Sequence, residues 1–131
     1  MKYVYPVLIK NEDGKFLVSV PDLSGCHTFG DSFCEAIEMT RDAMAMWLCI
    51  AEDRNENIPK PTMNYKSDNG TVSYIDVDTI AYRRATDSKA IKKTLSVPSW
   101  LNTQAELAGI NFSSVLQSAL MEQLHIPNDR V

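Results

Sequence analysis

Three polar side chains, Lys92, Thr94 and Ser96, occupy every second position of the segment 89–98. In an extended strand the side chains alternate between two faces, so these three would share one face. A lysine can donate hydrogen bonds to guanine acceptors in the major groove of DNA, and threonine and serine hydroxyls can contact any base. The spacing therefore predicts a face that reads base edges, on which Lys92 supplies the only charge.

The opposite face of the same segment is mostly apolar and should pack on the residues that follow. It carries Ile91, Lys93, Leu95 and Val97. Pro98 ends the strand because it has no backbone N–H, and it suits the first turn of a helix. A single strand cannot close its own sheet, so we expect the same strand of a second copy as its partner. Two such strands form a ribbon that fits the major groove.

Two short amphipathic helices are predicted after the strand, at 99–109 and 111–124, because apolar residues recur there at helical spacing. Asn111 is well placed as the N-cap of the second helix. The start of that helix offers free backbone amides together with the hydroxyls of Ser113 and Ser114. These two serines and Asn111 are therefore predicted to bind phosphate.

The order of strand, proline turn and two helices resembles the ribbon-helix-helix family of dimeric DNA-binding domains. The resemblance places a DNA-binding and dimerisation domain at 90–131, preceded by a polar linker at 83–89. It implies a homodimer paired through the strand at 90–97, with base readout from the polar face, and it leaves open whether dimers form tetramers. The alternative is an ordinary β-α-α fragment whose lysines are simply solvated.

Carboxylates in the first part of the chain raise the question of a nuclease. Two-metal phosphoryl chemistry needs carboxylates clustered around closely spaced ions. Asp76 and Asp78 share one strand face, while Asp22 and Asp31 fall in predicted loops. Alternating acids on a strand usually form a solvated face, and no triad pattern accompanies them. We therefore predict no catalytic residue and no cofactor.

Cysteine usage indicates neither disulfides nor a metal. Cys26, Cys34 and Cys49 are odd in number and form no C-x-x-C pair. Cys26 is followed by His27, but neither has the partner spacing of a zinc site. We predict no metal ligands, and we expect these thiols to be buried or idle.

Charge is divided unevenly along the chain. Residues 1–80 hold 7 Lys and Arg against 13 Asp and Glu, whereas residues 81–131 hold 6 against 4. The net charge of -4 argues against indiscriminate nucleic-acid binding, and an acidic first part favours a basic partner. There is no signal pattern, and the longest apolar run, 43–51, is too short to span a bilayer. We therefore expect a cytoplasmic protein without membrane contact.

Residues 1–82 read as a small domain in the order β-β-β-α-β. The predicted strands lie at 4–10, 16–20, 26–29 and 72–81, with a hairpin turn at 11–14. Ser32 and Glu35 form a capping box that opens a helix ending near Glu52.

Methionine is frequent on this predicted helix. Met39, Ala43, Met46 and Ile50 widen its apolar stripe. We interpret them as core residues; the alternative is an adaptable surface that binds a partner.

Several stretches of the first domain resemble the HicB antitoxin family. They are residues 5–7, the hairpin, 16–26, 30–32, 35–37 and 58–61, with 20–31 the most specific. The resemblance covers nearly all of 3–61. It implies an α+β chain in which a truncated, non-catalytic RNase-H-like domain precedes the ribbon-helix-helix domain. It also implies an antitoxin that neutralises a HicA-type toxin, a small basic RNase, and binds operator DNA to repress its own operon.

Two other functions stay open from the sequence. One is a transcriptional regulator whose first domain senses a small ligand, and the other is a metal-dependent nuclease. A neighbouring gene for a small basic protein would favour the antitoxin over the sensor, and metal-dependent cleavage by the chain alone would favour the nuclease. The sequence does not indicate which residues contact the toxin.

Overall fold

A tight β-hairpin begins the fold in the computed structural model, which describes residues 1–128. Strands β1 (Lys2–Glu12) and β2 (Lys15–Ser19) pair in antiparallel register, with Glu12 opposite Lys15. Asp13 and Gly14 join them with φ of 52° and 82°. A two-residue turn with positive φ at both positions matches the twist of the strands and favours Asp-Gly, so the predicted hairpin is confirmed.

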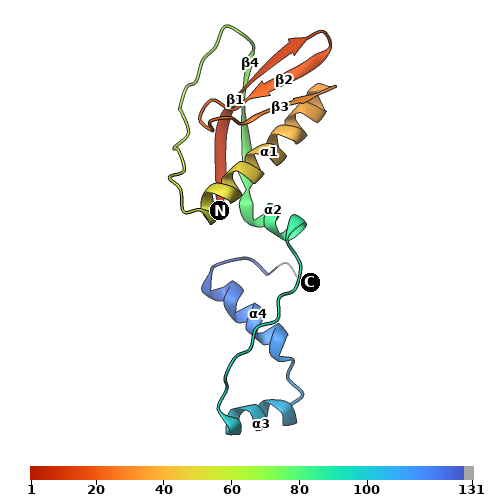
Figure 1. Ribbon diagram of the computed structural model, residues 1–131, viewed down its shortest axis with the longest axis vertical. Helices are drawn as coiled ribbons and strands as arrows, with labels where there is room; N and C mark the ends of the chain where they lie inside the picture. Colours follow the sequence, from red (N-terminus) through yellow and green to blue (C-terminus); the bar gives the residue numbers. More distant parts are fainter. Residues whose placement is uncertain (129–131) are drawn as a thin grey trace. The chain divides into compact units, whose positions relative to one another are not determined.

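The hairpin belongs to a four-stranded antiparallel sheet in the order β3-β2-β1-β4, with β3 at His27–Gly30 and β4 at Thr71–Asp78 (Figure 1). The longest strand, β1, lies between β2 and β4, and Tyr5 stands opposite Ile75. Because paired residues share a face, alternate residues of β1 and β4 fill the core while their neighbours face outward.

Helix α1 (Phe33–Asp53) packs across one face of the sheet (Figure 1). The Glu35 amide donates to Ser32 Oγ at 3.1 Å, so the predicted N-cap is confirmed. The core lies between helix and sheet. Its buried members include Tyr5, Val7, Ile9, Val18, Ile75 and Val77 from the strands and Ala36, Met44, Ala45 and Leu48 from α1.

Strand β3 approaches the start of α1 very closely. A Cβ placed on Gly30 would lie 2.4 Å from the backbone nitrogen of Ala36 and 2.7 Å from its Cα. Since backbone atoms cannot yield as a flexible side chain can, the end of β3 packs on the helix only when residue 30 has no side chain.

The long connection from α1 to β4 is tied at two points, once to β1 and once to the loop between β2 and β3. Tyr5 Oη donates to the carbonyl of Pro59 at 2.6 Å, and the Thr62 amide donates to Asp22 Oδ2 at 2.8 Å. Ile58, next to the first of these ties, packs against the core. The connection is therefore held to the first unit although it contains no helix or strand.

The predicted strand at 72–81 is too long, because β4 ends at Asp78 and helix α2 (Thr79–Thr86) begins at once. Asp78 Oδ1 accepts the Ile80 amide at 3.0 Å and the Ala81 amide at 3.4 Å, which makes Asp78 the N-cap. A carboxylate that binds the first free amides of a helix starts the helix there. Helix α2 thus crosses the predicted boundary at 82/83 and occupies part of the predicted linker 83–89.

The chain divides into two compact units, the first covering Met1–Ala90 and the second beginning at Ile91. The second unit contains α3 (Ser99–Leu107) and α4 (Phe112–Gln123), close to the predicted helices. Gly109 follows α3 with φ of 68°, the left-handed conformation expected of it. Asn111 Oδ1 accepts the Ser114 amide at 3.1 Å, which confirms Asn111 as the N-cap of α4.

No helix within residues 1–128 has the length and apolar character needed to cross a bilayer.

Candidate partner and nucleic-acid interfaces

Residues 91–97 form an exposed, irregular segment in the single chain, with no strand partner. A groove of the second unit shows how its two faces differ. Lys93, Leu95 and Val97 line this groove together with Leu101, Ala105, Ile110, Phe112, Val115, Leu116 and Ala119. Lys92, Thr94 and Ser96 do not line it and are exposed. The segment therefore separates into the two faces that strand alternation predicts, and base readout by the polar face stays a prediction.

At the start of α4 the helix cap already engages two of the groups that were predicted to bind phosphate. The side-chain oxygen of Asn111 and the amide of Ser114 bind each other in the cap. Within residues 1–128 the amide of Ser113 has no hydrogen-bond partner, and Ser113 and Ser114 are both exposed. Any phosphate contact here would therefore rest first on Ser113, and it too stays a prediction.

Neither helix of the second unit buries a single residue. Its exposed large apolar side chains are Ile91, Leu95, Val97, Trp100, Leu101, Leu107, Ile110, Phe112, Val115, Leu116, Leu120 and Leu124. So many exposed apolar groups on two short helices leave the helices without a core of their own. This unit needs a further surface to cover it.

The carboxylates considered for metal chemistry are engaged in structural contacts. Asp76 pairs with Arg41 at 3.3 Å, Asp78 caps α2, and Asp22 binds Thr62. Within residues 1–128 no three His, Cys, Asp or Glu side chains gather as metal ligands, and Asp31 is an exposed residue before α1. The geometry therefore gives the nuclease alternative no support.

Among the cysteines, Cys26 and Cys49 are buried and Cys34 is exposed, and all three are free thiols. Burial raises the pKa of both buried thiols, which disfavours the reactive thiolate.

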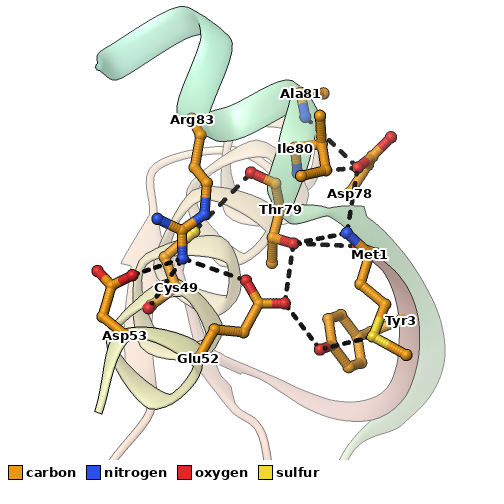
Figure 2. Close-up of polar contacts among 10 residues, drawn as sticks. All are labelled: Met1, Tyr3, Cys49, Glu52, Asp53, Asp78, Thr79, Ile80, Ala81 and Arg83. Atoms are coloured by element: carbon orange, nitrogen blue, oxygen red, sulfur yellow. Dashed lines mark hydrogen bonds and ion pairs between the residues drawn. The ribbon is translucent and has the colours of Figure 1, made fainter. Parts of the chain in front are cut away.

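A polar cluster that the sequence reading missed surrounds Glu52, in the last turn of α1 (Figure 2). Its carboxylate accepts Tyr3 Oη at 2.9 Å, Thr79 Oγ1 at 3.1 Å and Arg83 Nη2 at 3.2 Å. Arg83 also donates to Asp53 Oδ1 at 2.9 Å. Burial, followed by the hydrogen bond to Glu52, raises the pKa of Tyr3 to about 12. The cluster fastens α2 to α1, and no sequence pattern indicated it because α2 itself was not predicted.

The outward side of α1 differs from the predicted core stripe. Met44 is buried, but Met39, Met46 and Ile50 are 45%, 50% and 44% exposed. Reading these three as core was wrong, because the sheet covers only one side of the helix and they lie on the other. The spacing of Met39, Met46 and Ile50 beside acidic residues was the signal for this surface.

The face of the sheet opposite α1 also exposes apolar residues. The exposed large apolar side chains on this face come one from each strand and are Val4, Leu17, Phe29 and Tyr74. The first unit thus has two candidate partner surfaces, the outer side of α1 and the outer face of the sheet.

Comparison with known proteins is consistent with this two-unit arrangement. A profile of the HicB-like antitoxins of bacterial toxin–antitoxin systems matches residues 5–120. A UPF0150 protein of Thermoplasma acidophilum is 37% identical over 60 residues, covering 46% of this chain and 86% of that protein. An uncharacterised 14.9 kDa protein of Haemophilus phage HP1 is 29% identical over 104 residues, 75% of each chain.

Solved structures share the fold at low sequence identity. A toxin–antitoxin complex from Streptococcus pneumoniae has a chain with a TM-score of 0.58 and 23% identity, covering 94% of this chain and 99% of that one. The antitoxin HicB of Burkholderia pseudomallei has a TM-score of 0.51 and 22% identity, covering 92% and 98%. The fold is thus that of a component of toxin–antitoxin systems. Since the profile spans both units, the chain belongs to the HicB-like antitoxin family.

Proposed function

We propose that this antitoxin binds and neutralises a HicA-type RNase toxin through its first unit. The first unit would be a truncated RNase-H-like domain without catalysis of its own. Membership of the HicB-like family is the observation that carries this proposal. The acidic balance of residues 1–80 supports it, because an acidic surface speeds encounter with a basic partner.

The second part of the proposal is that residues 90–131 form a ribbon-helix-helix dimer that binds operator DNA and represses the operon. The exposed apolar stripe of α3 and α4 and the unpaired segment 91–97 support it. Pairing of that segment with a second copy would satisfy its backbone groups and bring the two copies of Lys92, Thr94 and Ser96 onto one surface.

The toxin proposal is tested by measuring RNA cleavage by the basic protein encoded beside this chain. We expect the purified full-length chain to abolish cleavage at a stoichiometric ratio. Undiminished cleavage in the presence of excess folded chain would refute the proposal.

The DNA proposal is tested by titrating operon-promoter DNA and a scrambled duplex at one fixed salt concentration. We expect tighter binding to the promoter. Ser113→Ala should weaken both duplexes alike, because phosphate contacts position a protein without specifying sequence. Equal affinity of the wild-type chain for the two duplexes would count against an operator-binding function.

A further inference from the structure

The outward side of α1 presents a continuous apolar ridge, formed by Met39, Ala43, Met46 and Ile50. Their spacing of four, three and four residues places them on one stripe of the helix. At 1.5 Å per residue the ridge is about 16 Å long. The three large side chains are about half exposed, so each has apolar surface left to bury.

Acidic residues run along one side of this ridge. Glu35, Glu38 and Asp42 are exposed, and within residues 1–128 none of them takes part in an ion pair. Two cations lie nearby: Arg41 is already paired with Asp76 at 3.3 Å, and Lys2 lines a pocket with Glu38 and Asp42 but forms no ion pair within residues 1–128. A partner that covers the ridge therefore meets three uncompensated negative charges, and burying them without cations would be costly.

The outer face of the sheet suits a basic partner less well. Lys15 Nζ lies 5.3 Å from the centre of the Phe29 ring, so a cation already covers the most exposed aromatic side chain there. Lys10 and His27 border the same surface with Leu17. Three carboxylates share this face, but Asp76 pairs with Arg41, Asp78 caps α2 and Glu12 stands opposite Lys15. A basic protein approaching beside Leu17 would therefore meet the like charges of Lys10 and Lys15.

We propose that the α1 ridge, with Glu35, Glu38 and Asp42 beside it, is the surface on which a basic protein docks. The partner would present an apolar groove for Met39, Met46 and Ile50, rimmed by lysine or arginine side chains. This is the arrangement by which an amphipathic helix is held in a groove, and flexible methionines adapt to the shape of the groove. The inference rests on the proposed function, since it takes this partner to be the toxin.

The test uses the full-length chain and the toxin encoded beside it, with the dissociation constant as the readout. Met46→Lys puts a positive charge in the middle of the ridge, and methionine and lysine have similar helix propensities, so α1 should stay folded. Tyr74→Lys is the matched control, because Tyr74 is 48% exposed against 50% for Met46 and lies on the opposite face of the sheet. We expect Met46→Lys to weaken toxin binding by roughly thirtyfold or more, as for loss of a central contact, and Tyr74→Lys to change it little.

A milder variant, Asp42→Asn, removes one charge without altering shape. It should slow association and reduce the dependence of the association rate on salt, while leaving dissociation nearly unchanged. This readout separates a docking role from loss of folding, which would not flatten the salt dependence.

The outcomes distinguish failure of the proposed docking surface from failure of the proposed antitoxin function. If the wild-type chain binds the toxin and Met46→Lys binds equally well, the ridge is not the docking surface although the antitoxin function stands. Loss of binding in Tyr74→Lys alone would assign the sheet face instead. A change in the chain's own oligomeric state, with toxin affinity intact, would assign the ridge to a second copy. Failure of the wild-type chain to bind the toxin would overturn the proposed function and this inference together.

Discussion

Val115 offers a direct test of whether the second unit forms a dimer. Its side chain lines the groove of that unit and is 56% exposed in the single chain. Val115→Ala removes two methyl groups, each contributing about 0.8 kcal/mol when fully buried. Since roughly half of this surface is left to bury, the loss on association is about 0.8 kcal/mol per copy. Two-fold symmetry applies it twice, to about 1.6 kcal/mol.

A loss of this size raises the dimer dissociation constant roughly fifteenfold. Alanine is the better helix former, by up to about 0.7 kcal/mol, so weaker association would not come from a poorer helix. Sedimentation equilibrium over a range of concentrations measures the constant, and circular dichroism checks the helix content. Ser118→Ala is the matched control, because it makes an alanine at an exposed position of α4 that does not line the groove.

We expect the control to associate like the wild-type chain. An unchanged dissociation constant for a folded Val115→Ala chain would refute the argument that this groove is covered by a second copy. So would a wild-type chain that stays monomeric with α3 and α4 fully formed.

Three further predictions follow from individual contacts. Lys92→Ala should weaken operator binding by roughly 2–6 kcal/mol, because a good base contact is lost in each of two copies; unchanged affinity of a folded dimer in the titration would show that the other strand face or another domain reads DNA. Asp76→Asn should leave neutralisation of the toxin intact and cost about 1 kcal/mol or less in denaturant unfolding, because its ion pair with Arg41 is exposed; magnesium-dependent RNA cleavage by the wild-type chain alone, lost in this variant, would contradict it. Tyr3 has a pKa of about 12 in the folded chain against 10 in the unfolded chain, so the unfolded chain loses the proton first and the stability from Tyr3 falls as pH rises from 10 to 12. Tyr3→Phe should therefore remove this part of the alkaline loss of stability, measured by urea unfolding. An unchanged loss would show that Tyr3 does not cause it.

The parts of the fold that depend on local chemistry were predictable from the sequence. Asp13-Gly14 specifies its turn through positive φ, and Ser32 and Asn111 each bind a backbone amide three residues ahead. These interactions need only neighbouring residues. For the same reason the helices of the second unit begin and end close to their predicted bounds.

The end of β4 was not predictable from the pattern of residue types. The alternation expected of a strand with one side inward continues through Ile75, Val77, Thr79 and Ala81. The two-residue repeat of the sequence therefore extends beyond Asp78, where the strand ends. What ends it is Asp78, whose carboxylate binds the amides of α2. An aspartate within an alternating run reads equally well as a solvated strand residue and as a helix cap.

Exposure of Met39 and Met46 could not be read from their apolar character either. Residue type indicates a tendency to be buried, but burial depends on how many neighbours surround a helix. With a sheet on one side of α1, Met44 enters the core and Met46, two residues further, faces away from it. For segment 91–97 the proposed second copy would supply the missing partner, and strand pairing between chains cannot be read from the contacts of one chain.

The close approach at Gly30 limits which substitutions this chain tolerates at that position. Gly14 and Gly25 are restricted by backbone conformation, with φ of 82° and 78° and open space where a side chain would stand; asparagine or aspartate can adopt such angles at modest cost. Gly30 is restricted by volume, since any substituent would collide with the backbone of Ala36. In a library of all single substitutions, positions 14 and 25 should therefore accept a small set of residues and position 30 none. One of the most selective positions in the first unit would then be a residue that has no side chain to recognise anything.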